Sequence, residues 1–226
     1  KALPEEEILI IEELYKQIKE ETPNANILVQ TYFEALTSFE RLTQLPVAGI
    51  GLDFVHGAKE NLKALQKFGF PKNKTLSLGI INGRDIWSAN LAEVVSTIRT
   101  VKQLGQVEDL WISSSCSLQH VPVSKDVEKK LSLELWDHLA FADEKIREIA
   151  HITYFIKKGE WLKEGIVKQS LQVIEALATH PIRKNKDVLD AVNALKTDDF
   201  TRDVPFAKRQ QIQKETLQLP DYPTTT

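Results

Sequence analysis

The chain has 226 residues, of which 42% are hydrophobic and 27% charged, with a formal net charge of -3. This composition is typical of a globular protein that is long enough to bury a core. There is no basic excess to hold nucleic acid or an anionic membrane surface. No apolar run approaches the ~20 residues that cross a bilayer, and the first residues lack the apolar segment of a signal peptide. We therefore expect a cytoplasmic protein.

The single cysteine, Cys116, limits the chemistry available to the chain. It excludes a disulfide within the chain and a zinc site built from pairs of cysteines. Low cysteine usage also agrees with a reducing compartment such as the cytosol.

A strand followed by a helix is predicted four times in the first 150 residues. After an amphipathic helix over residues 4–20, β-branched runs predict strands at 26–32, 48–54, 75–81 and 109–115. Helical spacing of apolar residues predicts helices at 35–44, 58–68, 90–104 and 129–149, the last with a buried stripe that includes Leu139 and Ile146. Asn90 with Glu93 resembles a capping box at the start of the third of these helices. Trp111, in the fourth strand, is expected in the core.

The strand pattern does not return after residue 152. Helices are predicted at 160–179 and 187–196, an extended stretch at 200–206 and a polar helix at 207–217. The tail 218–226 contains Pro220 and Pro223, which prevent a helix, and a Pro/Thr tail is typical of a linker. We therefore expect one domain over residues 1–196 and a linker over 197–226.

Polar or reactive residues follow each of the four predicted strands. In a barrel of parallel strands, functional residues gather at these carboxyl ends. Four strand ends are half of the usual eight. The sequence thus predicts an α/β fold of the TIM type, with about four βα units of a (βα)8 barrel, a half barrel, followed by helices and a linker.

Four uncommon segments occur in order along the chain, at residues 45–57, 79–87, 114–122 and 139–142. They read Leu-Pro-Val-Ala-Gly-Ile-Gly-Leu-Asp-Phe-Val-His-Gly, Gly-Ile-Ile-Asn-Gly-Arg-Asp-Ile-Trp, Ser-Ser-Cys-Ser-Leu-Gln-His-Val-Pro and Leu-Ala-Phe-Ala. Together they closely resemble the amino-terminal barrel of cobalamin-independent methionine synthase. The tail resembles the connection into the second barrel of that family.

This resemblance implies an enzyme of two facing barrels that transfers a methyl group from 5-methyltetrahydrofolate polyglutamate to homocysteine. Zinc and the homocysteine site belong to the carboxyl-terminal barrel, so zinc is expected in the parent enzyme and not on this segment. The chain resembles the second half of the amino-terminal barrel plus the linker, starting after an expected Asp-Glu-Pro and stopping before an expected Ile-Gly-Ser. Its expected partners are the missing half barrel, the catalytic barrel and the two substrates. Alone, it is expected to be inactive.

Asp53, Arg84 and His120 are the candidate substrate-binding residues, and no catalytic or metal-binding residue is predicted. Asp53 ends an apolar strand, where a charge needs a partner, and Arg84 on the next strand end is the obvious one. The pair either contacts substrate or forms an ion pair that ties two loops together. His120 either contacts ligand or the partner barrel, or caps a loop.

Cys116 stands where the catalytic barrel, by resemblance, has a zinc ligand. It is either a metal ligand or a packed residue at the barrel mouth. The catalytic barrel should also have His-x-Cys at its first strand end, where this chain has Tyr32-Phe33-Glu34. That departure favours packing.

Two other functions remain open from the sequence. One is a stand-alone, non-catalytic binding or scaffold protein derived from such a barrel, because no acid–base or metal constellation is assembled. The other is a different folate or corrinoid methyltransferase with a related barrel.

Overall fold

The computed structural model describes residues 3–158, 164–218, 220 and 222. The chain divides into two compact units, Lys1–Ala178 and Thr179–Thr226, which are described separately. Among the described residues, no helix combines the length and the apolar character needed to cross a membrane.

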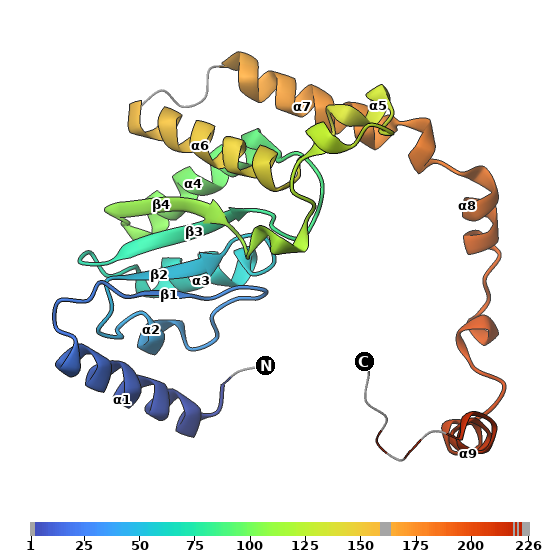
Figure 1. Ribbon diagram of the computed structural model, residues 1–226, viewed down its shortest axis with the longest axis horizontal. Helices are drawn as coiled ribbons and strands as arrows, with labels where there is room; N and C mark the ends of the chain where they lie inside the picture. Colours follow the sequence, from blue (N-terminus) through green and yellow to red (C-terminus); the bar gives the residue numbers. More distant parts are fainter. Residues whose placement is uncertain (1–2, 159–163, 219, 221, 223–226) are drawn as a thin grey trace. The chain divides into compact units, whose positions relative to one another are not determined.

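The first unit is built on a parallel sheet of four strands (Figure 1). The strands are β1 (Leu28–Gln30), β2 (Gly49–Asp53), β3 (Thr75–Ile81) and β4 (Asp109–Ser114), and they lie side by side in chain order. All four predicted strands are confirmed, β3 with its predicted bounds. Because every pairing is parallel, the four carboxyl ends meet at one edge of the sheet.

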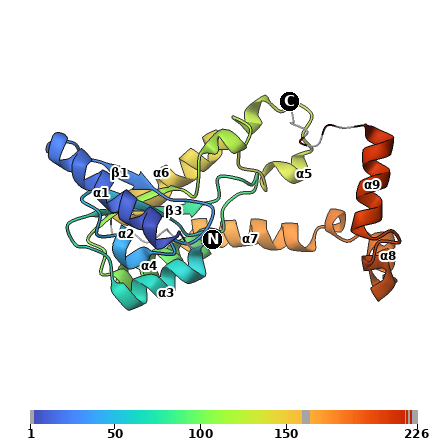
Figure 2. The ribbon, with the colours of Figure 1, turned by 90° about the horizontal axis from the view of Figure 1, so that it is seen from below.

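Helices cover the sheet as the βα pattern requires. The helices α3 (Ala58–Phe68) and α4 (Leu91–Gly105) pack side by side on one face of the sheet (Figures 1 and 2). Before β1 runs α1 (Glu5–Glu21). The predicted cap of α4 is present, since the Asn90 side chain accepts the Glu93 N–H at 3.4 Å.

The predicted helix at 35–44 is reduced to α2, which spans only Phe39–Leu42. Upstream of it, the Leu36 N–H donates to the Asn61 side chain at 3.1 Å. A backbone N–H held by another element is not available for a helix turn, so α2 begins late.

The predicted helix at 129–149 is wrong. Two 3₁₀ turns (Leu118–His120 and Lys125–Val127) and the short α5 (Leu133–Trp136) precede α6, which spans Ala142–Lys158. Between α5 and α6, the Ala140 N–H donates to the Ile86 carbonyl and the Ser88 N–H donates to the His138 carbonyl, both at 2.9 Å. This extended pairing interrupts the helix. The predicted stripe is correct at Leu139, which is buried, and wrong at Ile146, which is 54% exposed.

The predicted helix at 160–179 is present. The helix α7 spans Glu164–Thr179, while residues 160–163 of the predicted helix lie outside the described residues. In α7, Ser170 holds the entry to α4: its hydroxyl donates to the Ala89 carbonyl at 3.0 Å and accepts the Leu91 N–H at 3.1 Å.

The second unit contains α8 (Lys186–Asn193) and α9 (Phe206–Leu217), with 3₁₀ turns at Pro181–Arg183 and Thr197–Phe200. Both predicted helices are present, α8 shorter than expected. None of the described side chains in this unit is buried. Of the predicted linker tail, residues 219, 221 and 223–226 lie outside the described residues.

The core lies between the sheet and its helices. It includes Ile50, Leu52, Leu76, Leu78, Leu65 and Ile98, none of them more than 1% exposed. Because β2 and β3 have a strand on each side, they are buried along nearly their whole length. As an outer strand, β4 alternates instead, and the expectation that Trp111 is in the core is wrong, since its side chain is 54% exposed.

Replacing Leu65 with alanine tests the helix–sheet packing. Leu65 is fully buried on α3, so Leu65→Ala should lower the free energy of unfolding by about 2–5 kcal/mol through lost transfer energy and a residual cavity. Urea denaturation followed by circular dichroism measures this. The matched control is Leu9→Ala on α1, where the side chain is 53% exposed and the change should be within about 0.5 kcal/mol. Equal losses in both variants would contradict the packing.

Candidate functional site

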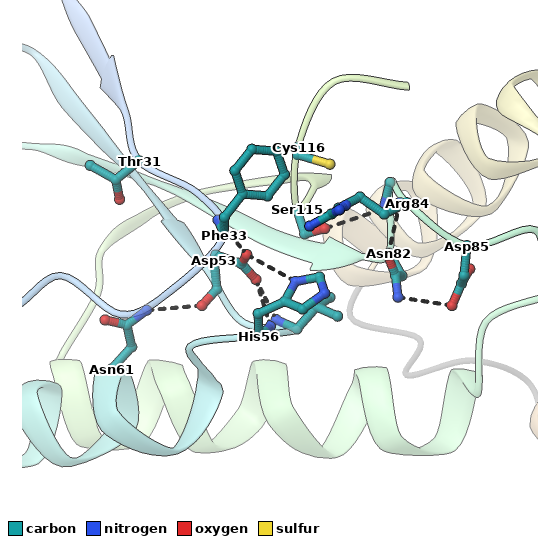
Figure 3. A network of polar contacts seen from close by, with 12 residues as sticks. Thr31, Phe33, Asp53, His56, Asn61, Asn82, Arg84, Asp85, Ser115 and Cys116 are labelled. Atoms are coloured by element: carbon teal, nitrogen blue, oxygen red, sulfur yellow. Dashed lines mark hydrogen bonds and ion pairs between the residues drawn. The ribbon is translucent and has the colours of Figure 1, made fainter. Parts of the chain in front are cut away.

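The carboxylate of Asp53 lies at the carboxyl end of β2 and is fully buried. Three backbone N–H groups donate to it: Phe33 to Oδ2 at 2.9 Å, and Val55 and His56 to Oδ1 at 2.7 and 2.9 Å (Figure 3). The His56 ring nitrogen Nδ1 is 3.3 Å from Oδ2. A buried carboxylate is tolerated when its oxygens are hydrogen-bonded in this way. Asp53 therefore joins the ends of β1 and β2.

The predicted ion pair between Asp53 and Arg84 is not formed. Backbone N–H groups fill the carboxylate instead, and among the described contacts the Arg84 side chain lies elsewhere, over the Phe33 ring at 4.9 Å from its centroid. Local backbone donors outcompeted the long arginine side chain because they lie within three residues of Asp53 or on the neighbouring strand end.

Asn61 on α3 braces the same region. Its side-chain amide donates to the Asp53 carbonyl at 2.9 Å and accepts the Leu36 N–H at 3.1 Å. Asn61 is fully buried and both of its polar ends are used. It thus ties α3 to the loops that follow β1 and β2.

Phe33 is the residue at which the candidate residues meet. Its backbone has φ 77°, a left-handed conformation that is strained for a bulky residue. Its N–H is the one that Asp53 accepts, its ring lies under the Arg84 guanidinium, and the His120 ring lies 5.9 Å away at an edge-on angle. The Tyr32 ring packs against it at 4.9 Å.

All three candidates predicted from the sequence therefore touch one aromatic residue, each from a different strand end. Asp53 is buried, whereas Arg84 and His120 are exposed. The central position of Phe33 is not predictable from the sequence, because an apolar residue at a strand end gives no signal of its strained backbone. The arrangement offers a cation held over an aromatic ring and a neighbouring imidazole, which suits a ligand that carries carboxylates or a π system.

The loop after β3 is fixed by its own side chains. Asn82 accepts the Arg84 N–H at 2.9 Å and donates to Asp85 at 2.8 Å. Gly83 packs directly on the loop after β4: its N–H donates to the Ser115 hydroxyl at 3.1 Å. A Cβ at Gly83 would lie 2.7 Å from the Cys116 carbonyl oxygen, so this position has no space for a side chain.

Cys116 is buried, and this burial raises the pKa of its thiol. A zinc ligand must be a thiolate, and zinc needs several such ligands converging on one point. Among the described residues, no three histidine, cysteine, aspartate or glutamate side chains are placed to hold a metal ion. The described residues of this chain thus do not fit a zinc site.

Cys116 should react slowly with thiol reagents. Because its pKa is raised and its sulfur is buried, the rate of reaction with 5,5′-dithiobis(2-nitrobenzoate) at pH 8 should be well below that of the urea-unfolded chain. The release of thionitrobenzoate measures both rates. A rate in the folded chain that matches or exceeds the unfolded rate would show an accessible, activated thiol.

Replacing Asp53 with asparagine tests how much its buried carboxylate stabilises the fold. The amide keeps the shape but presents an NH₂ to one of the donors that the carboxylate accepts. One buried N–H is then left without a partner, and the free energy of unfolding should fall by about 1–3 kcal/mol. Urea denaturation measures the change. The control is Asp126→Asn, at a site where the side chain is 61% exposed and where the same loss of charge should have little effect.

Comparison with known proteins supports the resemblance seen in the sequence. Residues 1–106 match the family model described as "Cobalamin-independent synthase, N-terminal domain". Over 226 residues the chain is 42% identical to the 5-methyltetrahydropteroyltriglutamate–homocysteine methyltransferases of Bacillus cereus (strain G9842) and Bacillus thuringiensis (strain Al Hakam). Each alignment covers 100% of this chain, which spans about 30% of the length of these curated relatives. The chain is therefore related to the amino-terminal domain of cobalamin-independent synthases over residues 1–106, and to these methyltransferases over its whole length.

Proposed function

We propose that this chain forms the second half of the amino-terminal (βα)8 barrel of a cobalamin-independent methionine synthase, followed by the linker toward its catalytic barrel. In the parent protein, methyl transfer from 5-methyltetrahydrofolate polyglutamate to homocysteine makes methionine. The role of this segment is structural and folate-side. The proposal rests on 42% identity over the whole chain to relatives that carry this activity in their names.

The open sheet supports the half-barrel assignment. Among the described residues, β1 and β4 each pair with one neighbour only, so both outer edges are available for further strands. A parallel sheet of this kind is stable when both faces are covered and its edges are paired or protected. The missing half of the barrel is the partner that we assign to these edges.

The candidate substrate contacts are Arg84 and His120, which are exposed at the carboxyl ends of the strands. Asp53 is buried and acts through Phe33, whose strained backbone it holds. Zinc, when bound to the parent enzyme, lowers the pKa of the homocysteine thiol. We assign zinc and homocysteine to the catalytic barrel, because the described residues here offer no ligand set. A cytoplasmic location stays a prediction.

An activity assay tests the structural role. The purified 226-residue chain, given 5-methyltetrahydropteroyltriglutamate, homocysteine and zinc, should form no methionine, because the homocysteine site lies on the absent barrel. Mass spectrometry of the products detects methionine. The full-length Bacillus cereus relative serves as the positive control. Methionine formation by the chain alone would overturn the proposal.

A binding assay tests the folate-side role. Equilibrium dialysis with 5-methyltetrahydropteroyltriglutamate should show an affinity that Arg84→Gln weakens roughly tenfold, the effect of losing one charge-assisted contact. The control is Lys63→Gln, which removes the same charge from an exposed position on α3. Equal weakening by both variants would indicate only a general charge effect and would contradict a contact at Arg84.

A further inference from the structure

A second recess in the first unit lies apart from the cluster around Phe33. It has a volume of about 610 Å³ and opens between the first turns of α3 and α4, beside the loop after β3. This volume is in the range of small-molecule sites and far above the space of one water.

Apolar side chains supply most of the surface inside this pocket, and the exposed, oppositely charged Lys59 and Glu93 also line it. The walls come from the end of β2, from α3, β3 and α4, and from α7, and include Phe54, Leu62, Ile80, Val94 and Ile174. These surfaces favour the flat or branched apolar body of a ligand over a strongly hydrated one.

At one end of the pocket lies a buried lysine that is held by hydrogen bonds. The Lys145 side chain is 1% exposed, and its ammonium donates to Asp85 Oδ1 and to the Trp87 carbonyl, both at 3.0 Å. Asn82 donates to the other oxygen of Asp85 at 2.8 Å. Lys145, Asp85, Trp87 and Asn82 all line the pocket.

Stability alone does not account for the buried ion pair of Lys145 and Asp85. A buried lysine–carboxylate pair is often no more stabilising than apolar residues of the same size. The ammonium has three N–H donors, and the described residues accept two of them. Asp85 accepts three donors, because the Trp87 N–H also donates to Oδ1 at 3.2 Å, and it retains one acceptor site on Oδ2, the oxygen that accepts Asn82. The pocket end thus presents a spare donor next to a spare acceptor, with no net charge.

We propose that this pocket binds a neutral, planar molecule with an amide or lactam edge. The carbonyl oxygen of such an edge accepts the third N–H of Lys145, and its adjacent N–H donates to Asp85. The ring lies against the apolar walls. A carboxylate is a poorer ligand, because it lacks the donor and is repelled by Asp85.

Titration of the intact chain with benzamide, 2-pyridone and benzoate, followed by calorimetry and ligand-observed NMR, tests this. Benzamide and 2-pyridone should bind, and benzoate should bind about tenfold more weakly, since its carboxylate meets Asp85. Absence of benzamide and 2-pyridone binding, or a preference for benzoate, would overturn the proposal.

Two kinds of variant locate the site. Asp85→Asn removes the carboxylate charge that pairs with Lys145, so benzoate should bind more tightly and benzamide more weakly, a reversal that a purely structural role does not produce. Thr97→Trp fills the pocket from α4, away from the ion pair, and should abolish binding of both probes. Its matched control, Ser96→Trp, places the same ring on the exposed side of α4 and should preserve binding. If Asp85→Asn does not fold, the tryptophan pair decides: binding that survives Thr97→Trp lies elsewhere and refutes the proposal.

Discussion

The buried carboxylate of Asp53 is the interaction on which the candidate site depends. It collects N–H groups from two loops, and one of them belongs to Phe33, whose left-handed backbone costs about 1–3 kcal/mol. Such a conformation persists only where the surroundings hold it in place. The hydrogen bond from the Phe33 N–H to Asp53 holds this conformation in place. Asn61 fixes Asp53 in turn, because its side-chain amide donates to the Asp53 carbonyl. The positions of Arg84 and His120 follow, because both side chains pack against the ring that this strained residue presents.

Much of the fold was predictable because its signals are local. The strand β3 and the helix α3 were predicted with their observed bounds, since β-branched runs and helical spacing each end at clear breaks. The helix at 129–149 was wrong for a non-local reason: residues near Leu139 pair with the loop after β3, and apolar spacing does not register a partner fifty residues away. The Asp53–Arg84 pair failed similarly. A sequence shows which charged side chains need partners. It does not show which backbone N–H groups will serve as those partners, because nearly every residue has one.

The loop after β3 connects the two polar regions of the first unit. Arg84 and Asp85 are adjacent, yet one lies over Phe33 at the mouth of the strands and the other reaches Lys145 in the pocket between α3 and α4. Asn82 contacts both, through its oxygen to the Arg84 N–H and through its nitrogen to Asp85. Gly83 permits the turn to pack on Cys116. Residues 82–85 thus place the side chains of Arg84 and Asp85 on two different surfaces.

The order of the strands has a consequence for how the sheet is assembled. In the described part of the chain, each strand after β1 pairs with the strand before it, and no pairing skips a unit. Loop closure for every step therefore spans a single βα unit, and long-range closure is needed only where a barrel is sealed. The sheet is able to grow by successive addition during synthesis, each unit docking on a template that already exists. A unit gained or lost at either edge leaves the inner pairings unchanged, which is the property that lets βα repeats be lengthened, halved or duplicated without redesigning their cores.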